Sequence, residues 1–113
     1  MWVFFDGGFV SIVDDLDSPK LLIRARDRDD LVAFCNVGTR RRRMPPIEET
    51  PANDYRFRVR LTRRAVGSIL ATIAFDIDYP NFKERIHVNQ GVDRARIYSG
   101  VWREAARIDS RHR

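Results

Sequence analysis

Arginine occupies every second position of one stretch of the chain, at Arg56, Arg58 and Arg60. Residues two apart in a β-strand point to the same face of a sheet, so these guanidinium groups would share one face. A second basic group, a run of four arginines, precedes them in the chain. Arginine binds phosphate or carboxylate through two parallel hydrogen bonds, so both groups could bind an acidic partner. The candidate binding residues are Arg40, Arg41, Arg42, Arg43, Arg56, Arg58 and Arg60.

The formal net charge of +5 is not spread evenly along the chain. The run Arg40–Arg43, with Arg111 and Arg113, accounts for six of the 21 basic residues, and the remaining fifteen face 16 acidic ones. For the strand arginines we therefore favour a solvated face, balanced by Asp and Glu of the helices, over a binding surface. For the run of four, a binding role and a solvated linker are equally open.

Two neighbouring features bear on the strand arginines. Arg24 and Arg26 also alternate, and they would join the same cationic surface if both strands belonged to one sheet. Aromatic side chains that could stack on single-stranded bases are not expected there. The apolar residues of the strand alternate to the opposite, buried side: Tyr55, Phe57, Val59 and Leu61.

A second polar cluster lies at the junction of two predicted helices and contains Asp76, Asp78, Asn81, Lys83 and His87. Its oxygen ligands could hold Mg²⁺ or Ca²⁺, and a spatially assembled enzyme site near Asp76, Asp78, Asn81 and His87 is an alternative function. The spacing matches no metal loop, however, and capping a helix is a sufficient role for Asp78. We predict no metal and no cofactor.

The case for nucleophilic catalysis is weak, because it needs a Ser or Cys beside a His partner. Cys35, the single cysteine, falls on the apolar stripe of a short predicted helix and is expected to be a core residue. His112 lies in the terminal tail. Phosphate-binding loops, dinucleotide fingerprints and zinc spacings are absent, so we favour a protein that is not an enzyme. One thiol forms no intrachain disulfide, and the first residues lack a signal-peptide pattern, which together predict a cytoplasmic protein with no membrane partner.

These side chains would be positioned by one α+β domain over residues 1–113, a common length for a single domain. The predicted order is βββαβααα: a three-stranded antiparallel meander, a helix, a fourth strand and three more helices, packed mainly on one sheet face. A basic, Pro-containing loop covers about 37–54. A right-handed crossover would run the third and fourth strands parallel, and we expect the fourth strand beside the first in a mixed sheet. The predicted strands are 2–5, 9–13, 21–26 and 55–61, and the predicted helices are 27–36, 62–77, about 80–90 and 93–108.

The N-terminal hairpin turns at Asp6-Gly7-Gly8 and is apolar on both faces. Trp2 and Phe4 alternate to one side, and Val3 and Phe5 to the other. The hairpin is therefore either central and covered on both sides, or it exposes a patch to a partner, most simply in a homodimer.

Several short motifs together resemble a group of small bacterial and phage proteins that have no assigned activity. The most distinctive is Asp-Tyr-x-Asn-Phe-Lys at residues 78–83, and the resemblance extends over most of the chain. It implies a self-contained prokaryotic or phage domain and no particular activity. The other motifs are Trp2-x-Phe4, Gly8-Phe9-x-Ser11-x-Val13, Arg24-Ala25-Arg26, Asp54-Tyr55-Arg56 and Tyr98-x-x-Val101-Trp102.

The sequence thus favours a small non-enzymatic interaction domain that binds an acidic protein or nucleic acid through its basic loop. The arginine strand face would be a second contact. A small enzyme and a structural homo-oligomer are the alternatives.

Overall fold

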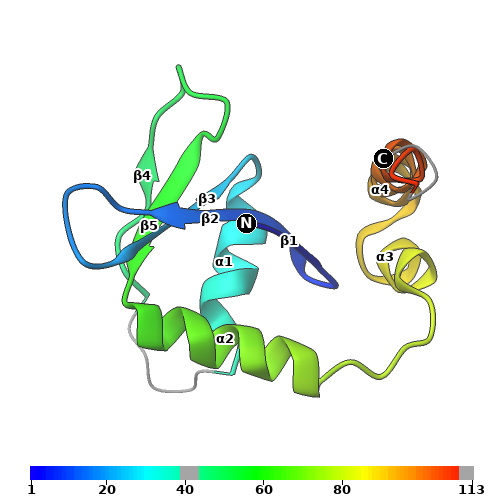
Figure 1. Cartoon of the computed structure of the whole chain (residues 1–113), viewed down its shortest axis with the longest axis horizontal. Helices are drawn as coiled ribbons and strands as arrows, with labels where there is room; N and C mark the ends of the chain where they lie inside the picture. The colour runs from blue at the N-terminus through cyan, green and yellow to red at the C-terminus, as the bar shows by residue number, and fades with distance from the viewer. Residues whose placement is uncertain (39–43, 110–113) are drawn as a thin grey trace. The chain divides into compact units, whose positions relative to one another are not determined.

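The computed structural model describes residues 1–38 and 44–109 (Figure 1). The chain divides into two compact units, Met1–Ile77 and Asp78–Arg113. Within the described ranges, no helix is both long and apolar enough to cross a membrane.

The first unit is a five-stranded antiparallel sheet with two helices, which confirms the predicted α+β class and the order of its elements. The strand order is β1-β2-β3-β5-β4. The elements are β1 (Trp2–Phe5), β2 (Gly8–Asp14), β3 (Leu21–Ala25), α1 (Arg28–Asn36), β4 (Glu48–Glu49), β5 (Phe57–Leu61) and α2 (Arg63–Phe75).

The predicted path of the fourth long strand is wrong. β5 pairs antiparallel with β3 and does not lie beside β1, so the sheet is not mixed. The reason is β4, a two-residue strand inside the predicted loop that pairs antiparallel with β5 and reverses the chain once more. Glu48 and Glu49 carry no apolar alternation, so the sequence pattern gives no sign of a strand there.

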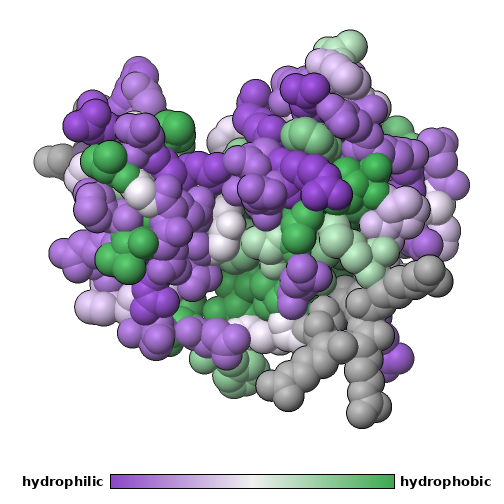
Figure 2. All heavy atoms as spheres, turned by 180° about the vertical axis from the view of Figure 1, so that it is seen from behind, coloured by the Kyte–Doolittle hydropathy of each residue, from purple (hydrophilic) through white to green (hydrophobic). Residues whose placement is uncertain are grey.

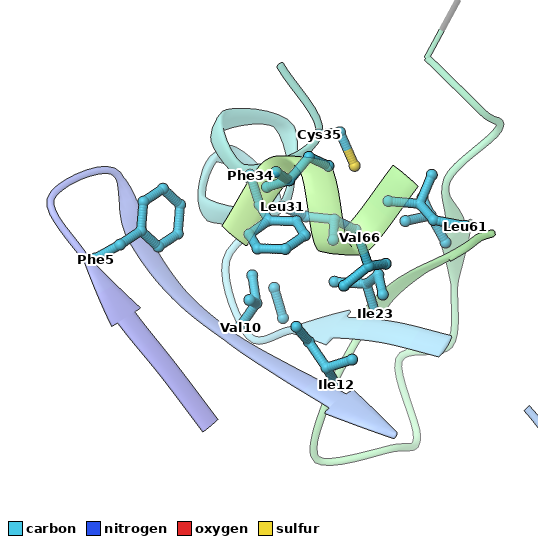
Figure 3. Packing of buried hydrophobic residues seen from close by; sticks show 12 residues of the cluster. Phe5, Val10, Ile12, Ile23, Leu31, Phe34, Cys35, Leu61 and Val66 are labelled. Atoms are coloured by element: carbon cyan, nitrogen blue, oxygen red, sulfur yellow. The ribbon is translucent and has the colours of Figure 1, made fainter. Parts of the chain in front are cut away.

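Both helices of the first unit pack on one face of the sheet (Figure 3). Alternate residues of the central strands point into this core, and Val10, Ile23 and Val59 are almost fully buried. Leu31, Phe34 and Cys35 from α1, with Val66 and Ile69 from α2, complete it. The predicted apolar faces of these elements and the buried position of Cys35 are confirmed.

Local signals set the ends of these helices. The Asp27 side chain accepts a hydrogen bond from the Asp29 N–H at the start of α1, and Thr62 does the same for the Ala65 N–H at the start of α2. Such side chains satisfy backbone N–H groups that have no partner within the helix.

The second unit is a pair of helices, α3 (Phe82–Gln90) and α4 (Val92–Ala105). Gly91 separates them, as predicted. Asn81, and not Asp78, caps α3 by accepting a hydrogen bond from the Glu84 N–H. The buried side chains here are Ile86 and Tyr98, and the Tyr98 ring stacks on Phe82 with centroids 6.0 Å apart.

Several large apolar side chains are exposed, including Phe75 at 88% and Trp102 at 62%. Figure 2 shows hydrophobic side chains reaching the surface among the hydrophilic ones.

Candidate functional site

A single row of side chains crosses the whole sheet on the face opposite the two helices of the first unit. Strand register pairs Trp2 with Ser11, Ser11 with Arg24, Arg24 with Arg58, and Arg58 with Glu48. Each pair lies directly opposite on neighbouring strands, so their side chains share one face. We call Trp2, Ser11, Arg24, Arg58 and Glu48 the cross-strand row.

The centre of the cross-strand row holds two arginines side by side. Arg24 and Arg58 are both partly buried, and neither has a carboxylate within ion-pair distance in the described parts of the chain. An Arg24 Nη atom donates to Ser11 Oγ at 2.9 Å, and an Arg58 Nη atom donates to the Tyr55 carbonyl at 3.4 Å. In both residues the Nε atom is buried, and no hydrogen-bond acceptor among the described residues reaches it.

This arrangement costs folding free energy. Like charges directly opposite on two strands destabilise a sheet by roughly 0.2–1 kcal/mol. A buried donor without a partner costs about 1–3 kcal/mol more. Departures from local consistency of this kind concentrate at functional sites, which draws attention to the pair.

Tyr55 supports the arginines from the same face. The Arg24 guanidinium carbon lies 4.5 Å from the centroid of the Tyr55 ring, and that of Arg26 lies 5.0 Å from it. The ring also faces Phe9, at 6.4 Å between centroids. Only 6% of Tyr55 is exposed, so it holds the cations in place and offers no open aromatic surface.

The alternating pattern predicted that Tyr55 lies on the core side of the sheet. This prediction is wrong. β5 begins at Phe57, and Tyr55 belongs to the preceding turn, where strand alternation does not apply. Phe57, Val59 and Leu61 do point to the core side, as predicted.

The prediction that the arginine face lacks aromatic residues is also wrong. Phe4 and Phe9 stack across β1 and β2 with ring centroids 4.4 Å apart, and Trp2 meets Phe9 edge-on at 6.0 Å. We call Trp2, Phe4 and Phe9 the hairpin cluster. Because Trp2 and Ser11 belong to the cross-strand row, the hairpin cluster continues the arginine surface toward β1. Trp2 is its most exposed ring, with 66% of the residue accessible.

The hairpin that carries this cluster is fixed to α1. The buried Asp30 accepts a hydrogen bond from the Phe9 N–H at 2.9 Å. A Cβ atom added to Gly8 would overlap the Asp30 side chain, so only glycine allows this close approach. β1 is an edge strand and Trp2 is exposed, so the hairpin is not a central one that is covered on both faces.

The three predicted arginines of the strand do not behave alike. Arg56 pairs with Glu49 at 2.9 Å, and Arg60 pairs with both Asp15 and Glu48, each at 2.9 Å. The predicted balance by acidic residues therefore describes Arg56 and Arg60, but its source is different: the carboxylates come from β4 and the β2–β3 loop, and not from helices. Arg58, between them, has no such partner among the described residues.

Asp15 shows how fully Arg60 is engaged in structure. The Ser18 hydroxyl lowers the pKa of the Asp15 carboxyl most strongly, and the Asp17 N–H and the Arg60 guanidinium lower it further. Burial of the carboxyl opposes them, but the pKa stays below its ordinary value. Only 5% of Asp15 is exposed, so Arg60 ties the β2–β3 loop to β5 and is not available to a ligand.

The predicted run Arg40–Arg43 lies outside the described residues. The second predicted cluster is only partly brought together. Asp76 ends α2 in the first unit, and Asp78 forms an ion pair with Arg85 in the second.

A shallow groove of about 380 Å³ lies on the surface of α3 and α4. It brings together Asn81, Lys83 and His87 from the predicted cluster. The Asn81 side chain is already used as the cap of α3, and the Lys83 ammonium lies 4.6 Å from the Trp102 ring centroid. Its lining residues are Asn81, Lys83, Glu84, His87, Ala95 and Ser99.

In residues 1–38 and 44–109, no three His, Cys, Asp or Glu side chains lie close enough together to bind a metal ion.

The chain matches no protein-family model, and no curated protein or solved structure matches it either. The resemblance to bacterial and phage proteins stays a prediction.

Proposed function

We propose that the first unit is a non-enzymatic domain that binds single-stranded nucleic acid through the face carrying the cross-strand row and the hairpin cluster. The observation that carries the proposal is the position of Arg24 and Arg58 in one row with the exposed Trp2. Guanidinium groups bind backbone phosphates, and an exposed aromatic ring stacks on a base.

The aromatic rings favour nucleic acid over an acidic protein. A carboxylate-rich peptide would use the arginines alone, whereas a nucleic acid offers both an anion and a flat π surface. Base–aromatic stacking contributes about 1–3 kcal/mol per base and tolerates any sequence. Sheets that recognise single-stranded RNA likewise stack bases on aromatic residues of an open face.

Single strands are favoured over duplexes by the same geometry. In a duplex the bases are stacked on one another and their faces are closed to Trp2. The face that carries the cross-strand row presents no helix to enter a groove.

Fluorescence anisotropy with labelled oligothymidylate and oligouridylate at low salt tests the proposal. Affinity should fall as salt rises, with a slope of about −0.7 in log–log form per phosphate neutralised. Trp2→Ala should lower affinity by about tenfold or more, within the range expected for one stacked base. Duplex DNA and a polyglutamate peptide serve as competitors. Absence of oligonucleotide binding at low salt, or equal competition by polyglutamate, would refute it.

The run Arg40–Arg43 enters the proposal as an additional phosphate contact. Changing all four residues to Ala should weaken binding equally for all base compositions and flatten the salt dependence. Arg56→Met is the matched control on the sheet, because Arg56 is exposed and already paired with Glu49. Loss of binding in the control but not in the loop variant would exclude the loop from the contact.

A further inference from the structure

We infer that the nucleic acid strand crosses the sheet at right angles to the β-strands, along the cross-strand row, and that the site requires more than one nucleotide. A base would stack on Trp2 at the β1 end, and a backbone phosphate would bind Arg24 and Arg58 at the β3–β5 step. This inference rests on the proposed function and adds the direction and the minimum length of the ligand.

The chemical character of the cross-strand row changes in order from β1 to β4. It runs from an exposed indole through a buried hydroxyl to two cations and then to the carboxylate of Glu48. Glu48 pairs with Arg60 at 2.9 Å, so that end of the row is neutralised and offers no free cation. An anionic chain would therefore be attracted to the middle of the row and not to its β4 end.

No path along a single strand offers the same combination. Along the chain of β5, Arg56 just before the strand and Arg60 within it are neutralised by glutamates. Along β3, Arg24 lies between Leu22 and Arg26, and the ring beside the two arginines, Tyr55, is buried, so this path has cations but no open ring. Along β1, Trp2 is followed on its face by Phe4, which brings no positive charge. Only a path across the strands joins an open ring to cations without a carboxylate partner in the described chain.

The span of this path sets the length of the ligand. Trp2 and Arg58 lie three strand spacings apart, which is about 14 Å. In a mononucleotide the base and the phosphate are separated by a single sugar, so one nucleotide cannot bridge both ends. An oligonucleotide can, and linking the two contacts makes the second one intramolecular.

The test is a length series that is read out by Trp2 itself. Trp2 and Trp102 are the two tryptophans of the chain, so Trp102→Phe leaves Trp2 as the single reporter. The probes are thymidine 5′-monophosphate and thymidylates of two, three, four and eight nucleotides, with the uridylate series in parallel. We expect quenching of Trp2 by all probes, with affinity rising at least about tenfold from the monophosphate to the shortest bridging oligomer.

A double-mutant cycle separates the path from simple binding. In the Trp102→Phe protein, Trp2→Phe and Arg58→Met should be coupled for the bridging oligomer and independent for the monophosphate. The affinities for the bridging oligomer and for the monophosphate are both measured by fluorescence anisotropy of the labelled ligand. Arg56→Met, two residues from Arg58 and already ion-paired, is the control and should change neither affinity nor coupling.

The outcomes distinguish the two proposals. If no oligonucleotide binds, the proposed function fails. If oligonucleotides bind but affinity does not change with length, or Arg56→Met weakens binding as much as Arg58→Met, the cross-strand path fails and the proposed function stands. Binding that is lost with Arg58→Met but unaffected by Trp2→Phe and Trp2→Ala would also overturn the path.

Discussion

Replacing Arg58 with methionine should stabilise the first unit while weakening its binding. Methionine keeps an apolar stem of similar length but removes the charge opposite Arg24 and the buried Nε. Relief of the like-charge contact contributes about 0.2–1 kcal/mol. Removal of the unpartnered donor contributes about 1–3 kcal/mol, against roughly 0.5 kcal/mol for the lost 3.4 Å hydrogen bond to Tyr55. The sum is a gain of about 0.7–3.5 kcal/mol, equivalent to roughly 3 °C or more in melting temperature.

The matched variant is Arg60→Met, two residues along the same strand face. Arg60 is the partner of the buried Asp15, so its removal leaves an unpaired carboxylate and should destabilise the fold. Two chemically identical substitutions are thus expected to change the free energy of unfolding in opposite directions. Urea unfolding followed by Trp2 fluorescence in the Trp102→Phe protein reports on the first unit. If Arg58→Met destabilised the unit as much as Arg60→Met, Arg58 would be an ordinary structural residue and the argument for a functional pair would fail.

Three further outcomes follow from the same structure. Gly8→Ala should lower the free energy of unfolding by about 1–3 kcal/mol, because the added methyl group overlaps the buried Asp30. An unchanged midpoint in thermal or urea unfolding would show that the hairpin is not held against α1. Asp15→Asn should destabilise at pH 7 and lose this effect below about pH 4, because a carboxyl whose pKa is lowered by folding contributes stability above its unfolded pKa and loses it as the pH falls through the folded value. An equal loss of unfolding free energy at pH 7 and pH 3 would contradict a pKa of Asp15 that is lowered by folding. Light scattering should show a monomer at binding-assay concentrations, since the proposed contact needs an open Trp2, and a dimer that Trp2→Ala dissociates would assign the hairpin to self-association instead.

Much of the first unit follows from local patterns in the sequence. Asp6-Gly7-Gly8 marks the hairpin, alternation marks β3 and β5, and Asp27 and Thr62 mark the helix starts. Each of these signals lies within a few residues of the element that it predicts. The strand order could not be predicted in this way, because it depends on β4. The two glutamates of β4 form a strand only by pairing with β5.

The candidate site was harder to predict than the elements that carry it. Register decides which side chains meet, and a shift of one residue turns every side chain of a strand to the other face. The placement of Arg24 opposite Arg58 required the antiparallel β3–β5 pairing, which the expected sheet order did not contain. One signal was within reach. A tight turn at Asp6-Gly7 already sets Phe4 opposite Phe9 and Trp2 opposite Ser11.

The acidic strand β4 has a kinetic consequence for the proposed binding. Glu48 and Glu49 act as built-in counterions for Arg60 and Arg56, so a ligand meets few unneutralised charges on the sheet. Few charges mean little long-range steering and a shallow energy well at each contact. On this face a strand would be released quickly and rebind nearby, and its residence time would be set by one stacked ring and one phosphate contact acting together.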